Sequence, residues 1–181
     1  MAAPTLKRGL WLAAAVGALA VLAVAALRGE RRESSGLDRY VPSGLMVGIA
    51  PERVTAVEVS GGGRRRRLLR TPRGWEVEPG DAAARRDPTP LVETGLRFLH
   101  GSMPQRVLSG AEAAPLSLAE AGLSPPRIQV EVRAGDAVRF RVDLGTTNPQ
   151  GFSCYARVGG RDDVYLLSRY VAQAWQQVLE P

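Results

Sequence analysis

In this chain of 181 residues, His100 and Cys154 are each the sole residue of their type, and both types serve in nucleophilic or acid–base catalysis. A Ser-His-Asp or Cys-His-Asn set needs a histidine as general base, so any such set has to include His100. One cysteine excludes an internal disulfide, and one cysteine with one histidine excludes the usual four-ligand zinc site. A hydrolase that uses His100 or Cys154 is therefore the enzymatic alternative.

Both residues also have a structural interpretation, which the sequence favours. His100 stands before Gly101 at the end of an expected helix, where a histidine meets the helix dipole favourably and a glycine suits the cap. Cys154 alternates with Phe152 and Ala156 in an expected strand, which places its thiol on the apolar face. We therefore expect a protein that is not an enzyme, with no catalytic residue, cofactor or metal site.

The most basic run of the sequence suggests anion binding instead. Arg64, Arg65, Arg66 and Arg67 are consecutive, in a chain whose net charge is +6. Such a run can bind lipid headgroups, an anionic envelope polymer or nucleic acid. No aromatic residues interleave with it, which argues against nucleic acid as a partner. The sequence favours a charged strand edge that repels other strands, because alternate residues of a strand face opposite sides.

A second candidate surface combines three residues of the carboxyl-terminal half. Arg139 and Arg141 alternate with apolar residues in one expected strand, and Tyr155 lies on the polar face of the next. If these strands pair in sequence order, Tyr155 lies near both arginines. We expect this group to contact a partner or an anion.

The elements that position these residues follow from hydrophobic periodicity. Strict alternation predicts strands at residues 127–133, 138–144, 152–158 and 164–167, with a hairpin turn at residues 134–136. A closing helix capped by Ser168 follows. Its apolar stripe consists of Val171, Ala174, Trp175, Val178 and Leu179.

The first half of the sequence has a similar outline. Strands are expected at residues 54–59, 66–70 and 75–77, followed by a helix that opens at Asp87-Pro88. The sequence thus predicts an α+β fold, with an antiparallel sheet built from two strands-then-helix units. Residues 57–59 and 130–132, both Val-Glu-Val, occupy matching places in these units.

The amino-terminal region predicts a membrane segment. Residues 9–27 form an uncharged apolar run, about 28 Å long as a helix, which matches the thickness of a bilayer. We divide the chain into a tail (1–8), a transmembrane helix or signal-anchor (9–27), a linker (28–45) and a soluble α+β domain (46–181). Cleavage after residues 23–25, Ala-Val-Ala, is the alternative. The arginines that follow the helix outnumber Lys7 and Arg8, so the charge count does not by itself support export.

Several short stretches resemble the family catalogued as domain of unknown function 4340. They are residues 54–59 (VTAVEV), 74–79 (GWEVEP), 121–130 (AGLSPPRIQV), 144–149 (LGTTNP), 155–157 (YAR) and 164–167 (VYLL). The resemblance implies a membrane-spanning helix followed by an exported α+β domain. It also implies an accessory role beside ABC-type transport or gliding-motility permeases, without catalytic residues.

Taken together, these observations predict a non-enzymatic, membrane-anchored accessory or scaffold protein of a cell-envelope complex. Its expected location is the inner membrane, as a single-pass protein with an extracytoplasmic carboxyl-terminal domain. The expected partners are the lipid bilayer and transporter permease or ATPase subunits. The main alternative is an exported module that binds an anionic polymer or lipid headgroup through the arginine cluster at residues 53–86, which includes Arg53 and Arg64–Arg67.

Overall fold

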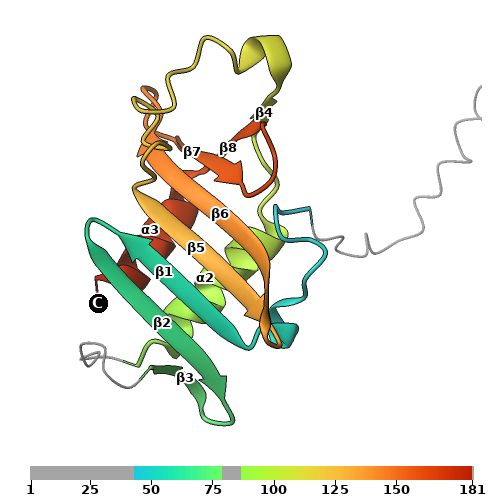
Figure 1. The fold of residues 1–181 in the computed structure, drawn as a ribbon, viewed down its shortest axis with the longest axis vertical. Helices are drawn as coiled ribbons and strands as arrows, with labels where there is room; N and C mark the ends of the chain where they lie inside the picture. Colours follow the sequence, from blue (N-terminus) through green and yellow to red (C-terminus); the bar gives the residue numbers. More distant parts are fainter. Residues whose placement is uncertain (1–42, 79–86, 181) are drawn as a thin grey trace, which may run out of the picture. The chain divides into compact units, whose positions relative to one another are not determined.

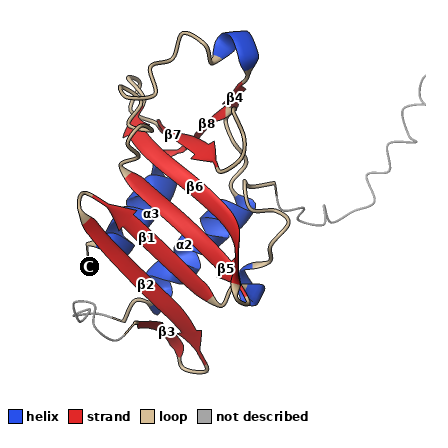
Figure 2. Cartoon of the chain, viewed as in Figure 1, coloured by secondary structure: helices blue, strands red, loops and turns tan. Residues whose placement is uncertain are grey.

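A computed structural model describes residues 43–78 and 87–180, and these residues form one antiparallel sheet with two helices. The strands lie in the order β3-β2-β1-β5-β6-β7-β8-β4 (Figures 1 and 2). Their bounds are β1 Ala56–Gly61, β2 Arg64–Thr71, β3 Gly74–Val77, β4 Arg106–Leu108, β5 Ile128–Ala134, β6 Ala137–Thr147, β7 Ser153–Val158 and β8 Val164–Ser168. The predicted antiparallel α+β domain is confirmed.

The two halves of the chain meet in the sheet at the antiparallel pair of β1 and β5. Val57 pairs with Val132 and Val59 with Val130, so that Glu58 lies opposite Glu131. The two Val-Glu-Val segments that the sequence placed in matching positions therefore pair directly with each other. β2 and β3 extend the sheet on one side of this pair, and β6, β7, β8 and β4 extend it on the other.

Both helices, α2 (Thr89–Gly101) and α3 (Arg169–Leu179), lie on the same face of the sheet, behind it in Figure 1. They contact each other, and α3 also contacts strands from both halves. Their apolar faces and the inward residues of the strands form one core that contains Trp75 and Trp175. The predicted stripe of α3 is confirmed, because all five of its residues are buried. Ser168 occupies the N-cap position of α3, but its side chain makes no capping hydrogen bond.

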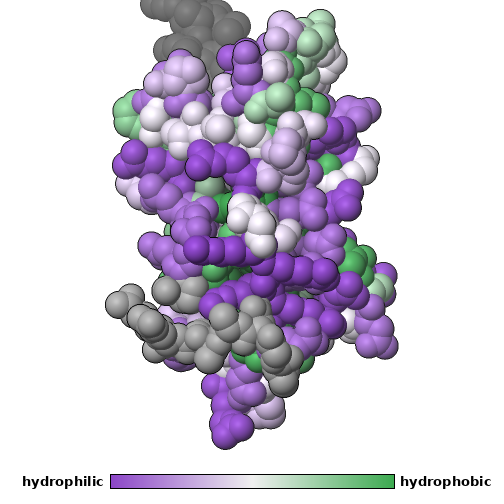
Figure 3. All heavy atoms as spheres, turned by 60° about the vertical axis from the view of Figure 1, so that its left-hand side comes forward, coloured by the Kyte–Doolittle hydropathy of each residue, from purple (hydrophilic) through white to green (hydrophobic). Residues whose placement is uncertain are grey.

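The opposite face of the sheet is divided into two parts. Near β7 and β8 it is covered by the segment between β4 and β5, which packs Ala121 and Leu123 against Val164. Over β2, β1 and β5 it carries charged side chains that include Arg65, Glu58 and Glu131. Figure 3 shows mainly hydrophilic residues on the side of the molecule that carries the β1–β2 hairpin.

Several details differ from the expectations. Phe152 was expected on the apolar face with Cys154, but β7 begins only at Ser153 and the Phe152 side chain is 73% exposed. The short strand β4 was not predicted, because a three-residue strand is too short for a periodic pattern. The domain also begins before residue 46, since the Gly44 amide donates to the carbonyl of His100 and Leu45 packs against the core.

The predicted tail, the transmembrane helix at residues 9–27 and most of the linker lie outside the described residues. Within the described part, neither helix has the length and the apolar character that crossing a bilayer requires.

Candidate functional site

His100 lies in the last turn of α2, as the sequence predicts, and forms hydrogen bonds with the segment that precedes β1. Its Nδ1 lies 3.2 Å from the carbonyl oxygen of Met46. Its own carbonyl accepts a hydrogen bond from the Gly44 amide at 3.0 Å. The residue thus holds the first described segment of the chain against the end of α2.

Cys154 is buried in the core, with only 1% of its surface exposed, which confirms the predicted apolar position. Burial raises the pKa of its thiol to about 11. Because the thiolate is the nucleophilic form, this thiol is unreactive at neutral pH. Among the described residues, no three His, Cys, Asp or Glu side chains gather closely enough to hold a metal ion.

The four consecutive arginines lie on β2 and point alternately to opposite faces, as predicted. Arg66 lies opposite Val59 in the pair with β1, on the helix side of the sheet, and only 8% of its surface is exposed. Its guanidinium donates to the carbonyl of Val178 in α3 at 3.3 Å. Arg66 therefore helps to attach α3 to the sheet.

The other three arginines of this run each form an ion pair. The pairs are Arg64 with Glu180 at 3.1 Å, Arg65 with Glu58 at 2.7 Å, and Arg67 with Glu78 at 3.1 Å. β3 pairs with β2 only from Leu68 onward. Within the described part, the segment Arg64–Arg66 therefore forms an outer strand edge, as expected from its charge.

Most other arginines of the described ranges also have a hydrogen-bond or ion-pair partner there. The described exceptions are four exposed residues, namely Arg53, Arg127, Arg139 and Arg141. Arg127 lies just before β5, whereas the other three line two clefts near the start of β6. Unpaired arginines that share a cleft are available to bind an anion from another molecule.

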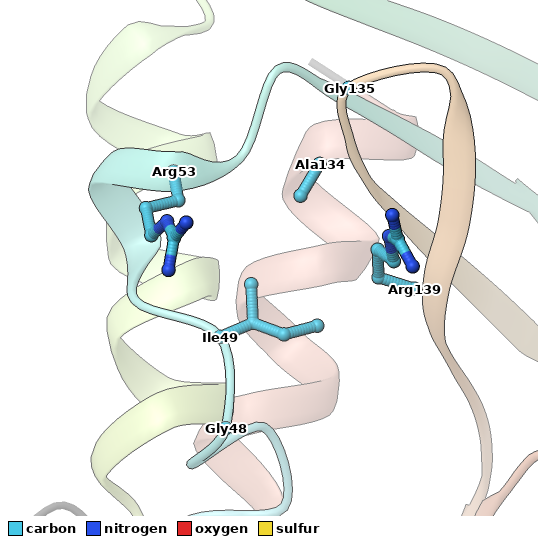
Figure 4. Close-up of a pocket in the computed structure, with 6 residues that line it drawn as sticks. All are labelled: Gly48, Ile49, Arg53, Ala134, Gly135 and Arg139. Atoms are coloured by element: carbon cyan, nitrogen blue, oxygen red, sulfur yellow. The ribbon is translucent and has the colours of Figure 1, made fainter.

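The first cleft has a volume of about 480 Å³ and lies between the turn before β1 and the β5–β6 hairpin. Figure 4 shows Arg53 and Arg139 on opposite sides of it, with Ile49 and Ala134 between them. Gly135 lies at the hairpin turn, where its φ of +70° suits glycine. Two guanidinium groups thus face one cavity from separate elements.

The walls of this cleft are held in place by hydrogen bonds. Arg53 ends the short 3-10 helix Pro51–Arg53. Arg70 donates to the carbonyls on either side of Arg53, to Pro51 at 2.9 Å and to Val54 at 2.8 Å. The opposite wall is fixed by Thr55, whose hydroxyl accepts a hydrogen bond from the Gly135 amide at 3.1 Å.

The second cleft has a volume of about 540 Å³ and shares Arg139 with the first. Arg141 and Arg161 also line it, together with one acidic residue, Glu131. Apolar side chains contribute to its surface, including Val138, which is 43% exposed. We call the two adjoining clefts the arginine groove, defined by Ile49, Arg53, Val138, Arg139, Arg141 and Arg161.

Strand geometry explains why Arg139 faces the groove. Val132 pairs with Phe140 and Arg133 with Val138, so Arg139 is the extra residue of a β-bulge and has no partner on β5. A bulge bends its strand and redirects a side chain. In addition, β7 ends at Val158, which pairs with Val142, and only the Gly159 amide reaches back to the carbonyl of Arg141. This half of β6 is therefore open on its outer side within the described structure.

Tyr155 is not brought to these arginines. It pairs with Leu166 and packs with Leu123 and Val164 beneath the segment that covers this part of the sheet. Arg141 lies beyond the end of β7, several register positions away from Tyr155. The expected group therefore separates into a half-buried tyrosine and two groove arginines.

The sequence counts Arg53 in the basic cluster at residues 53–86, but it does not place this residue beside Arg139. Arg53 lies in a short turn without periodicity, and its proximity to Arg139 arises only when β1 pairs with β5. Comparison of the chain with known protein families, curated proteins and solved structures finds no match.

Proposed function

We propose that this protein is a non-enzymatic accessory or scaffold subunit of a cell-envelope complex, tethered to the inner membrane through residues 9–27 with its sheet domain outside the cytoplasm. The resemblance to the family catalogued as domain of unknown function 4340 points to a transporter permease or ATPase as partner. The tether raises the local concentration of the domain near membrane partners, so weak contacts suffice.

One observation carries this proposal, namely the convergence of Arg53, Arg139 and Arg141 on the arginine groove. These arginines form no ion pair or side-chain hydrogen bond among the described residues, and such charged groups can contribute affinity and specificity to an interface. The roles of Cys154 and His100 also favour binding over catalysis. The thiol is buried, and the imidazole lies against the Met46 carbonyl.

The test is site-specific crosslinking of the full chain in its native membrane. A photo-crosslinking amino acid at Val138, in the groove, is expected to capture a reproducible envelope partner. The matched control is Arg73, whose side chain is 89% exposed and lies in the β2–β3 turn, outside the groove. A permease subunit captured at Val138 and not at Arg73 supports the accessory role. Equal capture at both positions, or capture at neither, contradicts it.

A further inference from the structure

The arginine groove has features that indicate which chemical class of partner it takes. Its residues include four arginines and one glutamate, so a positive excess remains inside the two clefts. Arg161 already donates to the hydroxyl of Tyr165 at 3.2 Å. Arg53, Arg139 and Arg141 have no partner within the described residues. The groove therefore favours an anionic ligand with more than one negative charge.

The apolar residues of the groove argue against a small inorganic ion. Ile49 and Phe140 are half-buried and Val138 is 43% exposed, and these side chains alternate with the arginines along the walls. The arginines are exposed and divided between two clefts. A single phosphate is too small to bridge both clefts, and it gains nothing from apolar contacts.

The position of the arginines also argues against a flat membrane surface. Arg53 and Arg139 face each other across a cavity (Figure 4). Electrostatic adsorption to a bilayer uses basic side chains that project toward the headgroups from one exposed face. A narrow chain, by contrast, can enter a cleft and place its charges between two guanidinium groups.

We propose that the arginine groove binds an extended, acidic segment of a protein partner, with its carboxylates at Arg53, Arg139 and Arg141 and an apolar side chain on Val138. The open half of β6 supports this geometry, because no described strand pairs with its outer side there and an extended chain can run alongside it. This inference rests on the proposed accessory function and names the chemistry of the partner.

The direct test measures binding of a fluorescent peptide of alternating Glu and Val residues to the full chain in neutral detergent micelles. Fluorescence anisotropy is expected to show saturable binding that weakens as salt is raised. A peptide of alternating Lys and Val residues is expected not to bind. Absence of saturable binding by the Glu–Val peptide overturns the proposal.

Charge-reversal variants locate the site. Arg139→Glu and Arg53→Glu are each expected to weaken binding about tenfold or more. The matched control is Arg127→Glu, which reverses another exposed arginine without a described partner, located outside the groove. It is expected to bind within about twofold of the parent chain. Equal weakening by all three variants indicates nonspecific attraction to the net charge and overturns the proposal. Near-ultraviolet circular dichroism verifies that each variant is folded.

Two further measurements separate this inference from the alternatives. If phosphatidylglycerol vesicles or long-chain polyphosphate bind through Arg139 and displace the peptide at lower concentration, the ligand is a lipid or a phosphate polymer, and the peptide proposal is overturned.

The second measurement repeats membrane crosslinking at Val138 in the Arg139→Glu variant. Unchanged capture of the partner overturns the groove inference while the accessory function stands. Loss of capture with Arg139→Glu but not with Arg127→Glu supports both.

Discussion

Glu58 and Glu131 lie directly opposite each other where β1 pairs with β5. Like charges at opposed positions of neighbouring strands destabilise a sheet. Glu58 is neutralised by Arg65, whose Nε lies 2.7 Å from its carboxylate. A hydrogen bond to Glu58, and then the charge of that residue, raise the pKa of Arg65. Glu131 lies opposite Arg141 on β6 without a described ion pair.

The first prediction uses the difference between the two glutamates: Glu58 has an ion pair with Arg65, whereas Glu131 has no described ion pair. Glu131→Gln removes the repulsion and is expected to raise the free energy of unfolding by about 0.5 kcal/mol. Glu58→Gln makes the same chemical change but removes the partner of Arg65, so it is expected to lower stability. Urea denaturation measures whether each substitution raises or lowers the free energy of unfolding. A loss of stability in Glu131→Gln would show that Glu131 has a stabilising partner.

The second prediction concerns Arg70, which connects three elements. Its guanidinium lies 2.9 Å from Glu93 of α2 and 4.6 Å from the ring centroid of Trp75. Arg70→Met keeps the aliphatic stem but removes these bonds and those to the turn before β1. We expect a loss of about 2 kcal/mol in denaturant unfolding and a shift in tryptophan emission. Arg73→Met, at an 89% exposed side chain, is the control and is expected to change stability by less than about 0.5 kcal/mol.

The third prediction follows from the raised pKa of Cys154. The folded pKa is about 11 against an ordinary value of 9.0, so the folded state holds the proton more tightly. The corresponding stability is fully present below about pH 9 and is lost as pH rises toward 11. The full loss, for a pKa raised from 9.0 to about 11, is about 3 kcal/mol. Cys154→Ala is expected to be less stable at neutral pH but to lack this part of the alkaline decline. Parallel declines in both proteins would contradict the assignment.

Thiol labelling provides an independent check of the same residue. At pH 8 the native protein is expected to react with a thiol reagent only at the rate at which it opens or unfolds, because the buried Cys154 is protonated. The protein in denaturant is expected to react at the rate of a free cysteine. Rapid labelling of the native state would contradict the buried position.

The fourth prediction concerns the contact between the two helices. A Cβ added at Gly95 of α2 would lie 2.7 Å from Cζ2 of Trp175 in α3. Gly95→Ala gains about 1 kcal/mol in helix propensity, but it forces the indole to move, at a cost of about 1–3 kcal/mol. We expect a net loss of stability in thermal unfolding. Gly48→Ala, which has open space around the added methyl group, is expected to be neutral. A more stable Gly95→Ala protein would show that Trp175 can shift without cost.

The parts of the fold that sequence predicted are those with regular periodicity. Val130 and Val132 alternate with polar residues, and their strand is present with the expected inward face. The position of Tyr155 was not predictable in the same way, because the segment that covers it is an irregular connection without periodicity. Arg139 was named as a candidate, but its direction depends on a bulge whose register is set by β5. The groove itself depends on Arg53, which long-range strand pairing brings to Arg139.

The arrangement of strands about β1 and β5 has a consequence for the covalent connection of the chain. One helix and its strands come before the irregular segment that ends at β5, and another helix with its strands follows. Each half supplies a central strand that is an open edge until it meets the other half. The two halves can therefore pair through β1 and β5 even when the backbone between them is cut. Two separately expressed fragments, cut in that segment, are expected to find each other and reconstitute the sheet, as the subunits of a heterodimer do.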